Sequence, residues 1–250
     1  MEIKSKAIDI KDFGGIPFTN TLSAARTNSA ALEKALYSAN ATGTTVDSRT
    51  VWIQPSEVYY IMNVELSELA DVGLQIDGKL VANNNISAWP HTTTSGSEIA
   101  ILYFSDCTNL RVYGEGLIDG KGLEWWSYVI ATGIDFRPHL FSVNRINGLE
   151  IFGGFVALNS PQYNFRLYDV INVHVRNITI LIDTEVQGRL LDQVSRTRPD
   201  FHDFIRVREF HIPPPEIFAL NTDGTIFPPF FIFSSFFIFL FFYSFILLVN

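Results

Sequence analysis

The chain has 250 residues, 47% of them hydrophobic, and a formal net charge of −8. This length fits one large domain or two small ones, and elongated all-β folds of this size are often one domain. The negative charge argues against a nucleic-acid binder, which would normally present a basic face. Cys107 is the single cysteine, so an intrachain disulfide is excluded.

The amino-terminal region predicts one helix and no secretory signal. Residues 1–12 contain no apolar run long enough for a signal peptide. Farther along, Asn28 or Ser29 can cap a helix, and Gly43 lies just past its expected end. The apolar face of this helix would consist of Leu32, Ala35, Leu36 and Ala39. We expect the helix to cover the open end of a stack of strands, which would otherwise expose unpaired backbone.

Four short segments of the chain resemble one another, namely residues 73–78, 109–114, 148–153 and 172–177. Each has apolar residues two apart, followed by Gly or Asn where the backbone must turn. The step from Leu149 to Val173 is about one coil of a parallel β-helix. The step from Leu110 to Leu149 is longer and indicates a coil plus an inserted loop. A β-sandwich with similar strands is the alternative that the pattern alone leaves open.

Several motifs occur in an order that is typical of one enzyme family. They are 114–122 (GEGLIDGKG) with Trp125 and Trp126, 137–140 (RPHL), 159–165 (NSPQYNF), 169–180 (DVINVHVRNITI) and 221–224 (NTDG). From about Asp9 to Gly224 the chain resembles the polygalacturonase family, glycoside hydrolase family 28. The resemblance implies an all-β fold, a right-handed parallel β-helix with an amino-terminal capping helix. Residues 1–225 would form the amino-terminal, incomplete part of such a domain.

The resemblance also implies a function. Members hydrolyse α-1,4-linked galacturonic acid in pectin with inversion, without a metal or organic cofactor, and are typically secreted. We therefore expect a pectic polysaccharide as partner, no nucleic acid, a monomer, and an extracellular location. Carried over to this chain, the family's water-activating carboxylate corresponds to Asp223, and Asn221 would contact substrate. A turn-forming Asp in the Asn-Thr-Asp-Gly corner is the alternative reading of Asp223.

The family's general acid cannot be placed. In the family it belongs to an Asp-Asp pair beyond the Asn-Thr-Asp-Gly motif, followed by a His-Gly and an Arg-x-Lys that grips the substrate carboxylate. No Asp, Glu, His, Arg or Lys follows Asp223 in this sequence. We therefore expect this chain to be inactive as it stands. The alternative is a non-catalytic β-helix that binds polysaccharide.

Other candidate residues favour structural interpretations. Trp125 and Trp126 could stack on sugar rings, but we expect packing. Asp119 and the glycines around it read as a structural corner. The arginines between Gln187 and His211 could form a basic loop over an acidic sugar chain, but a solvated insertion is the favoured interpretation. Four histidines show no metal-ligand spacing, so the sequence predicts no metal site at them. They are His139, His174, His202 and His211.

Residues 226–250 form an apolar, Phe-rich tail without a charge. Three interpretations apply: a membrane span over residues 230–249, buried β-helix core, or sequence that is not native coding sequence. Phe, Ser, Leu, Pro and Ile are what a pyrimidine-rich intron gives when translated, and the change falls inside a family motif. We interpret the tail as non-native or membrane-seeking.

Overall fold

The computed structural model describes residues 7–92, 99–133 and 136–183. Of the later chain it describes the backbone of four strands: β13 (Glu209–Ile212), β14 (Phe218–Leu220), β15 (Ile226–Phe227) and β16 (Phe245–Leu248). The predicted residues Asn221 and Asp223 lie outside the described residues, as do all tail residues except those in β15 and β16.

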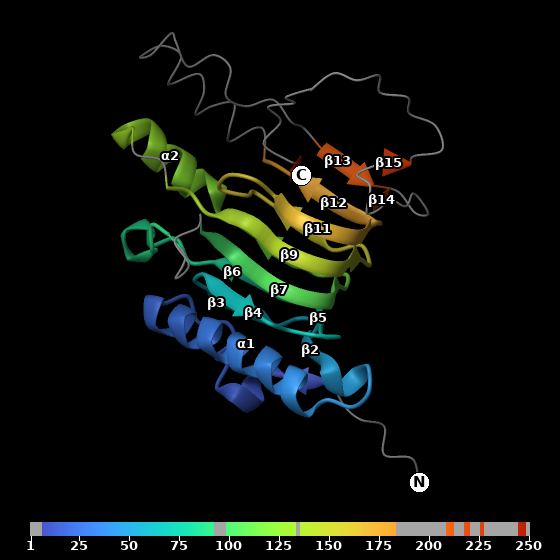
Figure 1. The fold of residues 1–250 in the computed structure, drawn as a ribbon. Coiled ribbons are helices and arrows are strands. Elements are labelled where there is room, and N and C mark those ends of the chain that lie inside the picture. Colours follow the sequence, from blue (N-terminus) through green and yellow to red (C-terminus); the bar gives the residue numbers. More distant parts are fainter. Residues whose placement is uncertain are drawn as a thin grey trace.

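Two sheets run side by side along the molecule, and the chain alternates between them (Figure 1). The larger sheet contains β1 (Ile8–Asp9), β2 (Thr50–Ile53), β4 (Val64–Ser67), β5 (Gly73–Ile76), β7 (Ala100–Tyr113), β9 (His139–Phe152) and β11 (Phe165–Val175). Beyond these, β14 and β16 pair with β11, and β15 pairs with β14. The smaller sheet contains β3 (Val58–Ile61), β6 (Lys79–Ala82), β8 (Leu117–Asp119), β10 (Val156–Leu158) and β12 (Ile178–Leu181), with β13 at its edge.

The strands from β1 to β12 pair in parallel, which is the arrangement of a β-helix. Among the described strands, only β13 and β14 pair with the earlier coils in antiparallel orientation. β13 pairs with β12 and β14 pairs with β11, and both follow residue 184. The predicted right-handed parallel β-helix is thereby confirmed. In the tail, β16 pairs in parallel with β11.

Core residues stack in register from coil to coil. In the larger sheet one buried column consists of Val51, Leu74, Val112, Ile151 and Val175. In the smaller sheet the matching column consists of Tyr59, Leu80, Ile118, Ala157 and Ile180. Side chains alternate between the two faces of a strand, so apolar residues two apart all enter the interior. This is the physical basis of the repeated pattern in the sequence.

Residues in the left-handed region bend the long strands at matching corners. Asn109, Gly148 and Asn172 have φ values of 52°, 83° and 57°, and the strand register aligns them. Asn and Gly adopt this conformation more readily than other residues. The segments 109–114, 148–153 and 172–177 therefore stack as the sequence predicts.

The first repeat is displaced from the alignment that the sequence suggested. Leu74 pairs with Val112 rather than with Leu110, a shift of two residues. The corner partner of Asn109 is Asp71, with φ of 56°, and not Gly73. A shift of two residues preserves the inward-facing set, so the apolar pattern alone could not distinguish the two registers.

Helix α1 (Leu22–Thr42) covers the amino-terminal end of the stack, below β2 to β5 in Figure 1. The predicted apolar face is buried, and Gly43 ends the helix as expected. The predicted cap is wrong, because the N-cap is Thr21, seven residues before Asn28, where the Thr21 hydroxyl accepts from the Ala24 N–H at 3.1 Å. Asn28 and Ser29 are buried in the helix interior instead, where they bond to the backbone of Tyr60 in β3 and of Met62 just after it.

Polar side chains of α1 satisfy the backbone at the open edge of the first coil. Ser29 Oγ accepts from the Met62 N–H at 2.9 Å. Farther along the helix, Glu33, Tyr37 and Asn40 accept from the N–H groups of Glu65, Ser67 and Ala70 at 3.0, 3.2 and 2.9 Å. Buried or edge backbone groups without partners are costly. The helix therefore does cover the end of the stack, as predicted.

Shorter helices occupy the turns. Three 3-10 helices span Ile10–Phe13 (η1), Asp47–Arg49 (η2) and Ile86–Ala88 (η3). Helix α2 (Gly122–Thr132) lies between β8 and β9, within the longer step that predicted an insertion. Within the described residues, no helix is both long enough and apolar enough to cross a membrane.

Candidate functional site

The motif at residues 114–122 forms the corner that precedes α2, with Asp119 and Lys121 as an ion pair. Lys121 Nζ lies 3.0 Å from Asp119 Oδ2, and the Lys121 N–H donates to Asp119 Oδ1 at 2.9 Å. Burial alone would lower the pKa of Lys121, but its hydrogen bond to Asp119 and the nearby negative charges raise that pKa above its ordinary value. Asp119 is buried, and its contacts support the structural interpretation.

Both tryptophans of this motif are packing residues. Trp125 and Trp126 are 0% and 5% exposed, so neither ring offers a face to a sugar. Trp125 meets Trp89 edge to face, with ring centroids 5.7 Å apart. The Trp126 Nε1–H donates to the carbonyl of Pro161 at 3.0 Å. They anchor α2 to the β-helix.

No metal centre appears among the residues that the structure describes. His139 is fully buried and stacks on Tyr163, whereas His174 is exposed on β11. No group of three or more His, Cys, Asp or Glu side chains is placed to hold an ion within residues 7–92, 99–133 and 136–183. His202 lies outside the described residues, and of His211 only the backbone is described.

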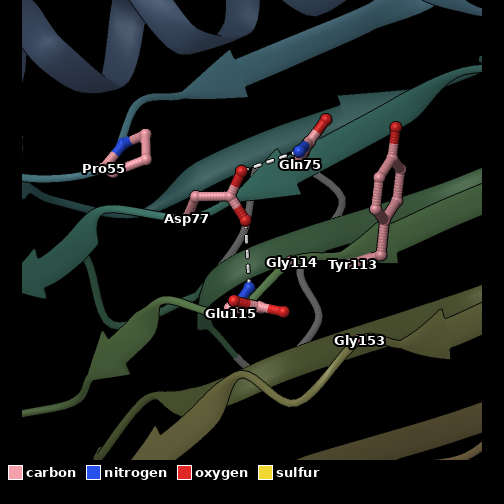
Figure 2. A pocket seen from close by; sticks show the side chains of 7 residues that line it. All are labelled: Pro55, Gln75, Asp77, Tyr113, Gly114, Glu115 and Gly153. Atoms are coloured by element: carbon pink, nitrogen blue, oxygen red, sulfur yellow. Dashed lines mark hydrogen bonds between the residues drawn. The ribbon is translucent and has the colours of Figure 1, made fainter.

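A hollow of about 510 Å³ opens on the outer side of the β-helix, where the larger sheet turns toward the smaller one (Figure 2). Its lining comes from four successive coils and consists of Pro55, Gln75, Asp77, Tyr113, Gly114, Glu115 and Gly153. The polar members are two carboxylates, one amide and one phenol, whose oxygens and nitrogens can exchange hydrogen bonds with hydroxyl groups.

Asp77 is held in one position by three donors. Its Oδ2 accepts from Trp52 Nε1 and Gln75 Nε2, each at 2.7 Å. Its Oδ1 accepts from the Glu115 N–H at 3.0 Å, a bond drawn in Figure 2. A carboxylate has about four acceptor positions, so Asp77 retains capacity for a further donor. The Glu115 side chain is exposed at the rim.

Glycines allow the coils to pack closely beside the hollow. A Cβ on Gly114 would lie 2.1 Å from the Ile76 carbonyl oxygen, and one on Gly153 would lie 2.6 Å from the Gly114 nitrogen. Both have positive φ, 130° and 112°. The backbone therefore approaches the preceding coil closely at this corner, which only glycine permits. The sequence signalled this turn but gave no sign of a hollow beside it.

A second feature of the same face is a stack of flat side chains. The strand register aligns Trp52, Gln75, Tyr113 and Phe152, and places Arg176 next in line after β11. The rings of Tyr113 and Phe152 lie nearly parallel, 4° apart, with centroids separated by 5.1 Å. The Arg176 guanidinium lies 4.5 Å from the centroid of Phe152.

Comparison with known sequences matches the region of the coils to a protein family. The sequence model described as Glycosyl hydrolases family 28 matches residues 49–192, which is more than half of the chain. Exopolygalacturonase A of Aspergillus niger is 24% identical over 144 residues, covering 55% of this chain and 32% of the relative. Exopolygalacturonase X-1 of Emericella nidulans is 29% identical over 143 residues, covering 55% and 31%. The chain thus spans about a third of the length of these relatives.

Solved structures share the fold. An exopolygalacturonase from Thermotoga maritima superposes with a TM-score of 0.54 at 18% identity, covering 72% of this chain and 48% of that one. The family 28 exopolygalacturonase from Yersinia enterocolitica superposes with a TM-score of 0.52 at 16% identity, covering 70% and 38%. At these identities the likeness shows the architecture alone.

Proposed function

The chain belongs to glycosyl hydrolases family 28, and from this membership we propose that the protein is a hydrolase of α-1,4-linked galacturonic acid in pectin, acting with inversion. The observation that carries the proposal is the match of the family model to residues 49–192, the same region that forms the coils from β2 to β12. Relatives over this region are named exopolygalacturonases. The proposal includes secretion and a monomeric state.

Asp223 is the proposed base of the reaction, with Asn221 beside it as a substrate contact. Inverting hydrolysis requires one carboxylic acid to protonate the leaving oxygen and one carboxylate to activate water, roughly 6.5 to 9.5 Å apart. The chain offers Asp223 for the second role. Because no Asp, Glu, His, Arg or Lys follows Asp223, the acid of the family pattern is missing and we propose that this chain is inactive.

The second candidate function is polysaccharide binding without hydrolysis, with residues 230–249 as a membrane tether. The observation that favours it is the same loss of charge after Asp223. A β-helix whose coils are intact can present a binding surface even when its catalytic acid is absent.

Reducing-sugar release from polygalacturonate tests these proposals. The full chain is compared with Asp223→Asn and with the matched control Asp12→Asn, whose side chain is exposed on η1. Hydrolysis that only Asp223→Asn abolishes establishes the enzyme and refutes inactivity. Polygalacturonate binding without hydrolysis supports the binding module. Absence of both binding and hydrolysis refutes both functions for this chain.

The tail is tested independently by sequencing the spliced transcript across the codons for residues 223–230. A message that continues into an Asp-Asp pair and a His-Gly supports a non-native tail and a complete hydrolase. A message that encodes the Phe-rich segment contradicts this interpretation and leaves the chain without its acid.

A further inference from the structure

Arg176 presents an oriented cation on the outer face of the larger sheet. Its guanidinium is held over the ring of Phe152, and Phe152 is held in turn by the parallel ring of Tyr113. Stacking on an aromatic face fixes the plane of a guanidinium and leaves the donors at its edge available. The Arg176 side chain is exposed. Its donors therefore point to a place that a solute can reach.

Among the described residues, no carboxylate forms an ion pair with Arg176. In the strand register, Glu150 is the acidic residue nearest to Arg176. Glu150 pairs with His174, however, which lies two residues before Arg176 on the same outward face. Elsewhere on the same larger sheet, by contrast, Arg145 engages Asp106 with two hydrogen bonds. An arginine that is oriented but not neutralised is suited to bind a carboxylate from outside the protein.

The opposite end of the stack is acidic. Tyr113 lines the hollow together with Asp77 and Glu115. Adjacent strands lie about 4.8 Å apart, so Arg176 sits roughly 10 Å from Tyr113, two strand positions along the ladder. A ligand that spans both ends must therefore carry negative charge at one end and hydrogen-bond donors at the other.

We propose that this face binds an acidic saccharide, with a uronate carboxylate at Arg176 and the hydroxyl groups of a neighbouring sugar in the hollow at Asp77 and Glu115. The two carboxylates repel a second uronate carboxylate but accept hydrogen bonds from hydroxyls, so the charges fix the direction of the bound chain. The stacked edges of Tyr113 and Phe152 form the apolar floor between the two ends. The choice of a galacturonate as probe rests on the proposed function.

The test uses the full chain carrying Asp223→Asn, so that the probe is not consumed. Trigalacturonic acid and its fully methyl-esterified form are titrated by calorimetry into this protein, into Arg176→Gln, and into Arg26→Gln. Arg26 is an exposed arginine on α1, so the control makes the same change of charge at a distant surface. A charge-assisted bidentate contact predicts that Arg176→Gln weakens binding of the acid by about tenfold or more.

The methyl ester, which lacks the charge, should bind Arg176→Gln and the parent protein alike. Glu115→Gln provides a second variant at the opposite end. Because a carboxylate is the stronger acceptor, this change should weaken binding of the ester, which carries no charge for Glu115 to repel. Equal affinity of the acid for the parent protein, Arg176→Gln and Arg26→Gln would overturn the proposal. Reducing-sugar release by the protein with Asp223 intact is measured separately. Absence of hydrolysis with retained Arg176-dependent binding supports the proposed inactivity of this chain and leaves the site standing, whereas hydrolysis without Arg176-dependent binding would overturn the site alone.

Discussion

Asn28 in helix α1 donates a hydrogen bond from Nδ2 to the carbonyl of Tyr60 in β3 at 2.9 Å. The same nitrogen donates to the Ile16 carbonyl at 3.0 Å, and Oδ1 accepts from the Ile16 N–H at 2.7 Å. Asn28 is fully buried. One amide therefore joins the helix, the preceding loop and the first strand of the smaller sheet.

Replacing this amide should destabilise the fold. Asn28→Ala removes three hydrogen bonds and leaves the backbone groups of Ile16 and Tyr60 without that partner, which predicts a loss of about 3 kcal/mol. Urea unfolding measures the change. Thr27→Ala, at the adjacent and exposed helix position, is the control and should stay within about 0.5 kcal/mol of the parent protein. Equal effects of the two substitutions would refute the role assigned to Asn28.

Two glycines with positive φ should respond differently to alanine. Gly133→Ala meets no atom within 4 Å, so its cost is the left-handed conformation alone, about 1–2 kcal/mol. Gly114→Ala would place its Cβ 2.1 Å from the Ile76 carbonyl oxygen and must shift the backbone of the preceding coil. We expect a clearly larger drop in thermal stability for Gly114→Ala. The reverse order would contradict the close approach at this corner.

Glu33 should make stability depend on pH. Its burial raises the pKa of its carboxyl above 4.5, against the hydrogen bond from the Glu65 N–H, while the charge of Glu65 raises it further. A group whose pKa is raised by folding stabilises the fold below its unfolded pKa, and this contribution is lost as pH rises through the folded value. Glu33→Gln keeps the acceptor without the charge. Its melting temperature should exceed that of the parent protein at pH 7, and the difference should shrink toward pH 4.5.

A Glu33→Gln difference that stays constant between pH 4.5 and pH 7, or grows as pH falls, would show that the charge of Glu33 is not penalised in the fold. Thermal unfolding followed by circular dichroism at several pH values provides the measurement. The same buffers at constant ionic strength keep screening of the exposed charges equal.

The pair of Arg145 and Asp106 should show salt-dependent coupling. Arg145 Nε and Nη2 lie 2.6 and 2.7 Å from the two carboxylate oxygens, and these bonds lower the pKa of Asp106. Stabilisation by a carboxyl with a lowered pKa is present above its unfolded pKa and is lost as pH falls through the folded value.

A double-mutant cycle with Asp106→Asn and Arg145→Gln should give a favourable coupling at neutral pH and low salt. Because both side chains are largely exposed, 1 M NaCl should reduce that coupling. Coupling that 1 M NaCl leaves unchanged would contradict an exposed ionic contact.

The sequence predicted the coils because their signal is repeated and local. Apolar residues two apart, followed by Asn or Gly, recur at Asn109, Gly148 and Asn172, where the backbone does turn in the left-handed region. The helix was predicted from its apolar face, but its start was misplaced. Asn28 and Ser29 are favoured at helix caps by their own chemistry. Their actual partners, Tyr60 and Met62, are distant in the sequence, so tertiary contacts decided their positions.

The face that carries the hollow could not be predicted for a related reason. Gln75, Tyr113 and Phe152 become neighbours only through the register of three strands. That register depends on where each coil begins, and α2 lengthens one of the steps between them. The first repeat also admitted an alternative alignment two residues away, which would have separated Gln75 from Tyr113. Asp223 and Asn221 stay predictions, since they lie outside the described residues.

Helix α1 also bears on how copies of the chain encounter one another. The first coil ends in backbone donors at Met62, Glu65, Ser67 and Ala70, and side chains of α1 occupy each of them. A second molecule with a matching strand would compete for the same donors, because an unoccupied edge is a template for further pairing. The polar side chains of α1 that accept these hydrogen bonds therefore leave the donors unavailable for pairing with another strand. Removing residues from the amino-terminal end of α1 should therefore favour end-to-end association of copies of the chain.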